Sequence, residues 1–195
     1  MTIKQIIKIR HGKPIIQKNY KLWTLFNISE FKKSRTSYDT AEIDQQLKPP
    51  HNLLQTIKNT KIAYSSGYKR SKESLQMLGI DNFIEEKKLL KEIEPKFGNF
   101  FNIKLPLCLW YLIFTILWFM GHSNDGESKK DSEIRAKKAA LFLQRNAIEN
   151  GSILYVGHRA INRLIGNELR KLGWTFSKKF KTCYWGDNIF YLDKD

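Results

Sequence analysis

Arginine and glycine occur together at three places in the chain, twice with histidine, and each place directly follows a short apolar segment. The three groups are Arg10-His11-Gly12, the stretch from Ser65 to Arg70, and Gly157-His158-Arg159. Arginine carries a rigid fork of donors that fits phosphate, and a neutral imidazole is a good nucleophile toward phosphorus. Glycine lets backbone N–H groups approach an anion closely. These residue types therefore indicate a site that binds phosphate.

The three groups can form one site only if the segments before them bring them together. Residues 3–9, 61–65 and 153–156 are short and apolar or β-branched, so we expect them to be strands. Strands that alternate with helices form a mainly parallel sheet, in which ligands bind beyond the carboxyl ends of the strands. The arginines and histidines are therefore predicted to meet at one edge of such a sheet.

Helix-forming segments separate the predicted strands. Ser128, followed by Asp131, is a typical capped helix start, and Gly79 and Gly173 mark two helix ends. We expect helices over residues 29–47, 69–78, 128–149 and 160–172, and a last edge strand over residues 189–192. The alternation predicts a three-layer α/β/α sandwich with a mainly parallel central sheet, built from residues 1–195 as a single domain.

The composition limits the partners and the kinds of site that we expect. The net charge of +15 favours an anionic partner such as a phosphorylated substrate, a nucleic acid or an acidic membrane, although the lysines are scattered along the chain. No nucleic-acid-binding motif accompanies the charge, so no nucleic-acid partner is predicted. Cys108 and Cys183 lack the neighbours of a zinc site and do not make a disulfide framework. The N-terminus lacks the apolar core of a signal peptide, which predicts a cytoplasmic protein.

Five short motifs follow one another along the chain. They are Arg10-His11-Gly12 with Pro14, Ser65-Ser66 with Arg70, Leu90-Lys91-Glu92, Glu127-Ser128 with Arg135-Ala136, and Val156-Gly157-His158. In this order they resemble the motifs of the histidine phosphatase superfamily, which includes the cofactor-dependent phosphoglycerate mutases. Ser71 and Arg159 depart from that pattern, which usually has alanine and glycine at these positions. Together the motifs are specific, whereas the first triplet alone would not be.

The resemblance implies a role for the residues at the strand ends. His11 would be the nucleophile, and it would carry the phosphoryl group as phosphohistidine between two displacements. Arg10, Arg70 and His158 would surround the non-bridging oxygens and stabilise their charge. Because these cations would already surround the phosphoryl group, neither a metal ion nor another cofactor is expected.

The resemblance also implies a proton donor for the leaving group. Glu92 is the first candidate, Glu94 and Glu127 are the alternatives, and Glu127 is more readily understood as orienting a loop or an arginine. Gly12 and Arg159 are candidates for additional contacts to phosphate. Arg159 could equally narrow the site or impair it.

An uncharged apolar segment, residues 105–121, is the most unusual part of the sequence, and we expect a helical insert at about 103–121. This segment is at the lower limit of length for a transmembrane helix. A span there would place the first and third strands on opposite sides of a membrane and separate the predicted site residues, so we do not expect it to cross a membrane. Three interpretations remain open. The favoured one is a buried helix of the domain; the others are a wall of an apolar substrate pocket, or a surface for peripheral membrane association or self-association.

The leading functional hypothesis is hydrolysis of phosphate monoesters, with a phosphorylated small molecule or protein as substrate. A weakly active module that binds phosphorylated ligands is the alternative. A phosphotransferase of the mutase type is less favoured, because Lys13-Pro14-Ile15 does not match the sequence that follows the first motif in the mutases. The sequence does not define the substrate or the oligomeric state.

Overall fold

A six-stranded sheet forms the centre of the molecule in the computed structural model, which describes residues 4–15, 20–94, 103–122, 126–176 and 179–192. The strand order is β4-β3-β6-β1-β8-β7. The strands are β1 (Lys4–Arg10), β3 (Ile62–Ser65), β4 (Ile84–Glu85), β6 (Ser152–Gly157), β7 (Thr175–Phe176) and β8 (Asp187–Leu192). Strands β1, β3, β4 and β6 pair in parallel, whereas β8 is antiparallel to β1 and to β7. The prediction of a mainly parallel sheet is therefore confirmed.

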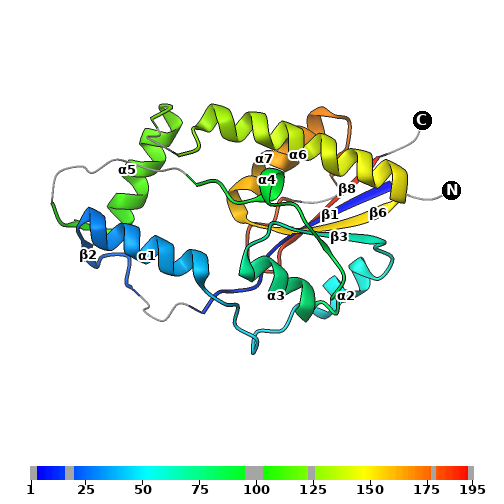
Figure 1. Ribbon diagram of the computed structural model, residues 1–195, viewed down its shortest axis with the longest axis horizontal. Helices are drawn as coiled ribbons and strands as arrows, with labels where there is room; N and C mark the ends of the chain where they lie inside the picture. The colour runs from blue at the N-terminus through cyan, green and yellow to red at the C-terminus, as the bar shows by residue number, and fades with distance from the viewer. Residues whose placement is uncertain (1–3, 16–19, 95–102, 123–125, 177–178, 193–195) are drawn as a thin grey trace.

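Helices cover both faces of this sheet, as Figure 1 shows. Helices α6 (Lys129–Asn150) and α7 (Arg159–Lys171) lie on one face, and α2 (His51–Ile57) and α3 (Lys69–Met77) lie on the other. The short α4 (Lys87–Leu90) follows β4. The arrangement confirms the predicted three-layer α/β/α sandwich.

The central strands are apolar on both sides because both sides are covered. In β1, Ile6 packs into the cluster beneath α6 and α7, whereas Ile7 and Ile9 pack into the cluster beneath α2 and α3. Strand β6 alternates in the same way, with Tyr155 on the first side and Val156 on the second. This double burial explains why Ile153 to Val156 of β6 form a continuous apolar run instead of an alternating pattern.

Local capping signals were reliable guides to several helix ends. Ser128 and Asp131 form the predicted capping box at the start of α6. Gly79 follows the end of α3 with φ of +77°, a conformation that glycine adopts without steric cost. The strand predicted over residues 3–9 begins in the described residues at Lys4, and Ile3 lies outside them.

Two predicted elements were wrong in extent or place. The helix expected over residues 29–47 is α1 (Ile28–Thr40), because Ile43 is buried, makes an isolated bridge with Pro14 and donates its N–H to Glu73. This bridge needs an extended backbone. The strand expected at the sheet edge over residues 189–192 is β8, which lies between β1 and β7.

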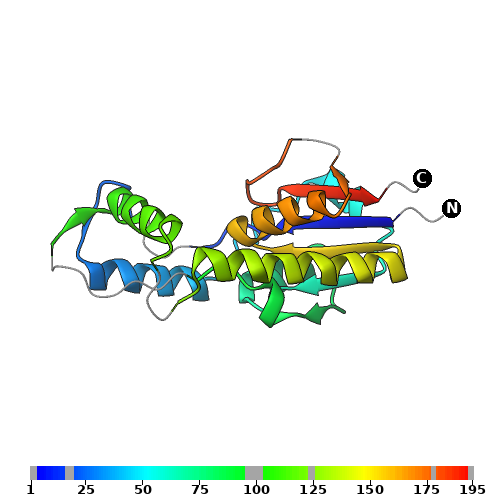
Figure 2. The same cartoon turned by 90° about the horizontal axis from the view of Figure 1, so that it is seen from above.

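A separate arm extends from the end of the sheet, as seen from above in Figure 2. We call the arm the unit made of β2 (Leu25–Phe26), α1, β5 (Leu105–Pro106) and α5 (Leu107–Phe119). Strands β2 and β5 pair antiparallel. The helices pack through their own cluster of buried side chains, namely Phe26, Ile28, Phe31, Leu107, Trp110 and Phe114.

The predicted helix in the apolar segment is present as α5, but the expectation that it is buried in the domain was wrong. Only three of its 13 described residues, Leu107, Trp110 and Phe114, are buried. The reason is that α5 packs on α1 along one side and has no helix of the sandwich over the other (Figure 2). Among the described residues, no helix has the length and apolar character to cross a membrane.

Candidate active site

His11 lies directly after β1, at the carboxyl end of the parallel strands. The strand pairing fixes its position, because its backbone N–H donates to the carbonyl of Gly157 at the end of β6. The imidazole is buried, and its Nδ1 lies 2.7 Å from the carbonyl oxygen of Gly12. A carbonyl oxygen can only accept, so Nδ1 donates and Nε2 carries the free lone pair. This is the tautomer that the proposed nucleophile requires.

The surroundings of His11 keep its ring neutral. Burial lowers the pKa of His11 to about 3, with smaller contributions from the nearby charges of Arg70 and Arg10. The hydrogen bond to Gly12 acts in the opposite direction but does not offset burial. The imidazole is therefore unprotonated at neutral pH.

His158 lies beside His11, at the end of the neighbouring strand β6. The two ring centroids are 4.9 Å apart. The Nε2 atom of His158 lies 2.8 Å from the hydroxyl of Ser66, which follows the adjacent strand β3. Burial lowers the pKa of His158 well below its ordinary value, and the charges of Arg70 and Arg10 lower it further.

The positive charges of both predicted arginines lower the pKa of both histidines, although the guanidinium groups are also engaged in contacts within the protein. Arg10 donates to the carbonyl of Thr182 over 2.6 Å, and its guanidinium carbon lies 3.9 Å from the centre of the Tyr184 ring. Arg70 is buried and donates to the carbonyl of Asp39 over 2.7 Å. Within the described part of the chain, the Nε atom of each arginine is buried and has no hydrogen-bond partner. Two buried donors thus remain free in the neighbourhood of the histidines.

Three tyrosines surround this group, and they were not among the predicted site residues. Tyr68 lies with its ring centre 4.8 Å from that of His158, in an edge-to-face arrangement. Tyr38, at the end of α1, lies over the guanidinium of Arg70 at 4.7 Å. Burial and a hydrogen bond with Tyr184 raise the pKa of Tyr38 to about 12. Tyr68 stands inside the second motif, whereas no local signal marks Tyr38, which comes from the arm.

The carboxylate of Glu92 lies at the amino-terminal end of α7, the helix that begins immediately after His158. Its Oε1 accepts from the N–H groups of Ile161 at 3.0 Å and of Ile93 at 2.9 Å, and its Oε2 lies 3.4 Å from the nitrogen of Ala160. Burial raises the pKa of Glu92, while these backbone N–H groups act in the opposite direction. The raised pKa favours the protonated form of Glu92 relative to a fully exposed carboxyl group.

The alternatives to Glu92 occupy different surroundings. Glu94 accepts a hydrogen bond from the hydroxyl of Tyr68, whose ring contacts His158, so it also lies on the histidine side of the site. Glu127 forms a two-fold hydrogen-bonded ion pair with Arg135, as the interpretation of Glu127 as an orienting residue requires. Of the three carboxylates, Glu94 is thus linked to His158 through Tyr68, and Glu92 is bound to backbone N–H groups of the residues that follow His158.

Gly12 and Arg159, the two remaining candidates for contacts to phosphate, have different surroundings. The N–H of Gly12 donates to the hydroxyl of Ser74 over 2.9 Å, so it is already used within the protein. A Cβ atom on Gly12 would lie 2.6 Å from the Trp185 ring, which explains the need for glycine at this position. Arg159 is exposed at the first position of α7, next to His158.

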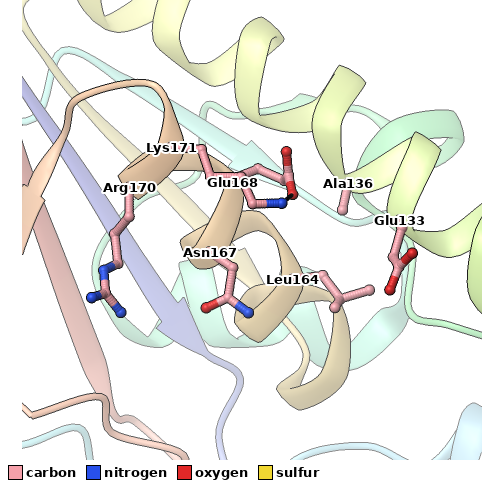
Figure 3. A pocket seen from close by; sticks show the side chains of 7 residues that line it. All are labelled: Glu133, Ala136, Leu164, Asn167, Glu168, Arg170 and Lys171. Atoms are coloured by element: carbon pink, nitrogen blue, oxygen red, sulfur yellow. Dashed lines mark hydrogen bonds and ion pairs between the residues drawn. The ribbon is translucent and has the colours of Figure 1, made fainter.

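A groove of about 610 Å³ lies between α6 and α7, and none of the predicted site residues lines it (Figure 3). It is lined by Glu133, Ala136, Leu164, Asn167, Glu168, Arg170 and Lys171. Lys171 and Glu168 form an ion pair across one turn of α7, which neutralises part of this lining. Over the described ranges, no group of three or more His, Cys, Asp or Glu side chains is placed to hold a metal ion.

Comparison with known proteins identifies the fold through structures rather than sequences. No family model matches the sequence, and no curated protein matches it. A phosphoserine phosphatase from Entamoeba histolytica, solved with 3-phosphoglyceric acid, is 21% identical with a TM-score of 0.60, over 95% of this chain and 89% of that one.

Two other solved structures are similar over nearly the same length. The product of open reading frame Rv3214 from Mycobacterium tuberculosis is 15% identical with a TM-score of 0.56, over 95% of this chain and 89% of that one. The ecdysone phosphate phosphatase from Bombyx mori, solved with tungstate, is 12% identical with a TM-score of 0.53, over 95% of this chain and 88% of that one. The chain therefore shares the fold of these solved proteins, two of which are phosphatases, and this agrees with the resemblance inferred from its motifs.

Proposed function

We propose that this protein is a phosphatase that hydrolyses phosphate monoesters through a phosphohistidine on His11, without a metal ion. The observation that carries the proposal is the hydrogen bond from Nδ1 of His11 to the carbonyl of Gly12, which leaves Nε2 as a fixed, unprotonated lone pair. The low pKa of this ring supports the same assignment, because protonation would remove the nucleophile.

In the first step, Nε2 of His11 attacks phosphorus and the bond between phosphorus and the ester oxygen breaks. Negative charge on the transferring group is stabilised by Arg10 and Arg70, whose charges act on His11, while the neutral ring of His158 lies beside it. The free Nε atoms of both arginines support this role, because a bound phosphate would supply the acceptors that they lack.

The ester oxygen that leaves needs a proton, and we assign this proton to Glu92. Its raised pKa favours the protonated form, and Oε1 already accepts the two shorter backbone hydrogen bonds, so the proton would be held on Oε2. In the second step, the resulting carboxylate takes a proton from water, the water oxygen attacks phosphorus, and the bond to Nε2 breaks. General acid–base catalysis of this kind contributes about 10²–10⁴-fold.

The proposal is tested by hydrolysis of an aryl phosphate in the presence of EDTA. The variant is His11→Asn, which keeps a polar side chain near the original size, and the matched control is His51→Asn, at an exposed position of α2. We expect activity in the native protein and the control, and its loss in His11→Asn. A labelled phosphoenzyme that is stable in alkali and labile in acid is expected in the native protein alone.

Each contrary outcome has its own meaning. Activity that disappears in EDTA and returns with a divalent cation would contradict the metal-independent step. Turnover by His11→Asn at the native rate would contradict the nucleophile. Binding of phosphorylated ligands without turnover in the native protein would favour the alternative, a phospholigand-binding module of the same fold.

A further inference from the structure

Helix α5 has two apolar faces, and the protein covers only one of them. No charged residue occurs in residues 105–121. Leu107, Trp110 and Phe114 face α1 and are buried. The outer face carries side chains at the helical spacing of three and four residues, all of them exposed: Leu109, Leu112, Ile116 and Phe119.

Exposed apolar side chains continue around the start of α5. The segment that leads into β2 is attached there by two hydrogen bonds, from the N–H of Cys108 to the carbonyl of Leu22 and from the N–H of Leu107 to the carbonyl of Thr24, both 3.0 Å long. In this segment Trp23 is 75% exposed and Leu22 is 61% exposed. We call these side chains and the outer side chains of α5 the apolar face of the arm.

Positive charge lies at both ends of the apolar face. Lys21 and Lys104 are exposed and stand next to the two segments that pair as β2 and β5. At the other end, the ammonium group of Lys129 lies 5.2 Å from the centre of the Phe119 ring. The whole chain carries a net charge of +15. An anionic surface that also accepts apolar side chains would therefore complement this part of the molecule on two counts.

We propose that the apolar face of the arm binds the surface of a membrane that contains anionic lipids. Helix α5 would lie in the interface with its outer side chains among the acyl chains and the lysines near the head groups. Its 13 residues make a helix about 20 Å long, shorter than the ~30 Å of a hydrocarbon core, so it would lie along the membrane. Trp23 has the amphipathic ring that is common at this depth.

A second copy of the chain is the other occupant that an uncovered apolar face could have. Two copies would each bring a net charge of +15, and this repulsion opposes association, whereas the same charge favours an anionic bilayer. The fold of the arm also leaves its buried cluster complete, since Trp110 already donates to the carbonyl of Phe26 over 2.7 Å. The uncovered side chains are thus available without opening the arm.

The test is co-sedimentation of the full chain with vesicles of phosphatidylcholine and phosphatidylserine, and with vesicles of phosphatidylcholine alone. The variant is Leu112→Gln/Ile116→Gln, at positions 53% and 49% exposed. The matched control is Leu141→Gln/Ile148→Gln on α6, at positions 45% and 43% exposed. The same pair of residue types is thus removed from a helix of the arm and from a helix of the sandwich.

We expect the native chain and the control to bind the anionic vesicles, less tightly as the salt concentration rises, and the arm variant to bind about tenfold more weakly or worse. Circular dichroism and hydrolysis of a soluble aryl phosphate check that the arm variant is folded. Absence of binding by the native chain, or equal binding by native chain and arm variant, would overturn the proposal. Equal binding to both kinds of vesicle would also overturn it. So would a native chain that is a dimer in sedimentation equilibrium, if only the arm substitutions abolish that dimer.

Discussion

Arg135 and Glu127 are joined by two hydrogen bonds, from Nε to Oε1 at 2.6 Å and from Nη2 to Oε2 at 2.7 Å. The Nη1 atom of Arg135 donates, over 2.8 Å each, to the carbonyls of Leu89 and Lys91. The ion pair therefore fixes the backbone directly before Glu92. Arg135 and Glu127 are positioning residues in this arrangement, because they act on the candidate general acid without contacting the histidines.

Glu127→Gln is expected to lower the rate of hydrolysis of alkyl phosphates about tenfold, which corresponds to ~1.4 kcal/mol. The amide cannot hold the guanidinium with two charge-assisted bonds, so the backbone at Glu92 loses its fixed position. Aryl phosphates, whose leaving groups need less protonation, should slow less. The control is Glu133→Gln on α6, whose carboxylate lies 3.7 Å from the Lys129 ammonium group. Equal slowing of both substrate classes would indicate a general loss of stability instead.

Glu92→Gln and Glu94→Gln separate the two candidates for the general acid. We expect Glu92→Gln to make the rate depend much more steeply on the pKa of the leaving group, because the amide cannot donate the catalytic proton. Glu94→Gln keeps an oxygen that can accept from the Tyr68 hydroxyl but removes the negative charge, and it should have a smaller effect that is similar for all leaving groups. The measurement is kcat for a series of substituted phenyl and alkyl phosphates. A steeper dependence in Glu94→Gln alone would transfer the role to Glu94.

Arg70→Lys keeps the charge but removes the fork of donors. We expect the KM for a phosphate monoester to rise about tenfold, and the rise in melting temperature caused by tungstate to shrink. The melting temperature without ligand should also fall, because Arg70 donates to the carbonyl of Asp39 at the end of α1. Arg145→Lys, at an exposed position of α6, serves as the control. An unchanged response to tungstate would exclude Arg70 from the phosphate site.

The histidines make a defined contribution to the dependence of stability on pH. In the window between the ordinary value of 6.5 and about 3, the unfolded chain binds a proton at His11 that the folded chain does not bind. The free energy of unfolding therefore falls as the pH decreases through this window, and burial of His158 acts in the same direction. We expect urea unfolding to show a smaller slope with pH for His11→Asn than for the native chain. Parallel slopes for native chain, His11→Asn and the His51→Asn control would contradict the buried neutral state of His11.

Much of the fold followed from local signals, because strand ends and helix caps depend on residues close in sequence. Arg10, His11 and His158 meet because parallel pairing aligns the ends of β1 and β6, which the order of elements predicted. The early end of α1 could not be predicted, since the bridge between Ile43 and Pro14 and the hydrogen bond to Glu73 are long-range contacts. The presence of Tyr38 over Arg70 depends on the same arm and had no local signal.

The strand order has a consequence for the synthesis of the protein. Strands β1 and β3, which precede His11 and Arg70, do not pair with each other; each pairs with β6, which lies between them. A nascent chain that has not yet released residues 152–157 from the ribosome thus lacks the strand that joins these two parts of the site. Until β6 is available, the backbone N–H and C=O groups along one edge of β1 and one edge of β3 lack their strand partner, and such unpaired edges can pair with other chains.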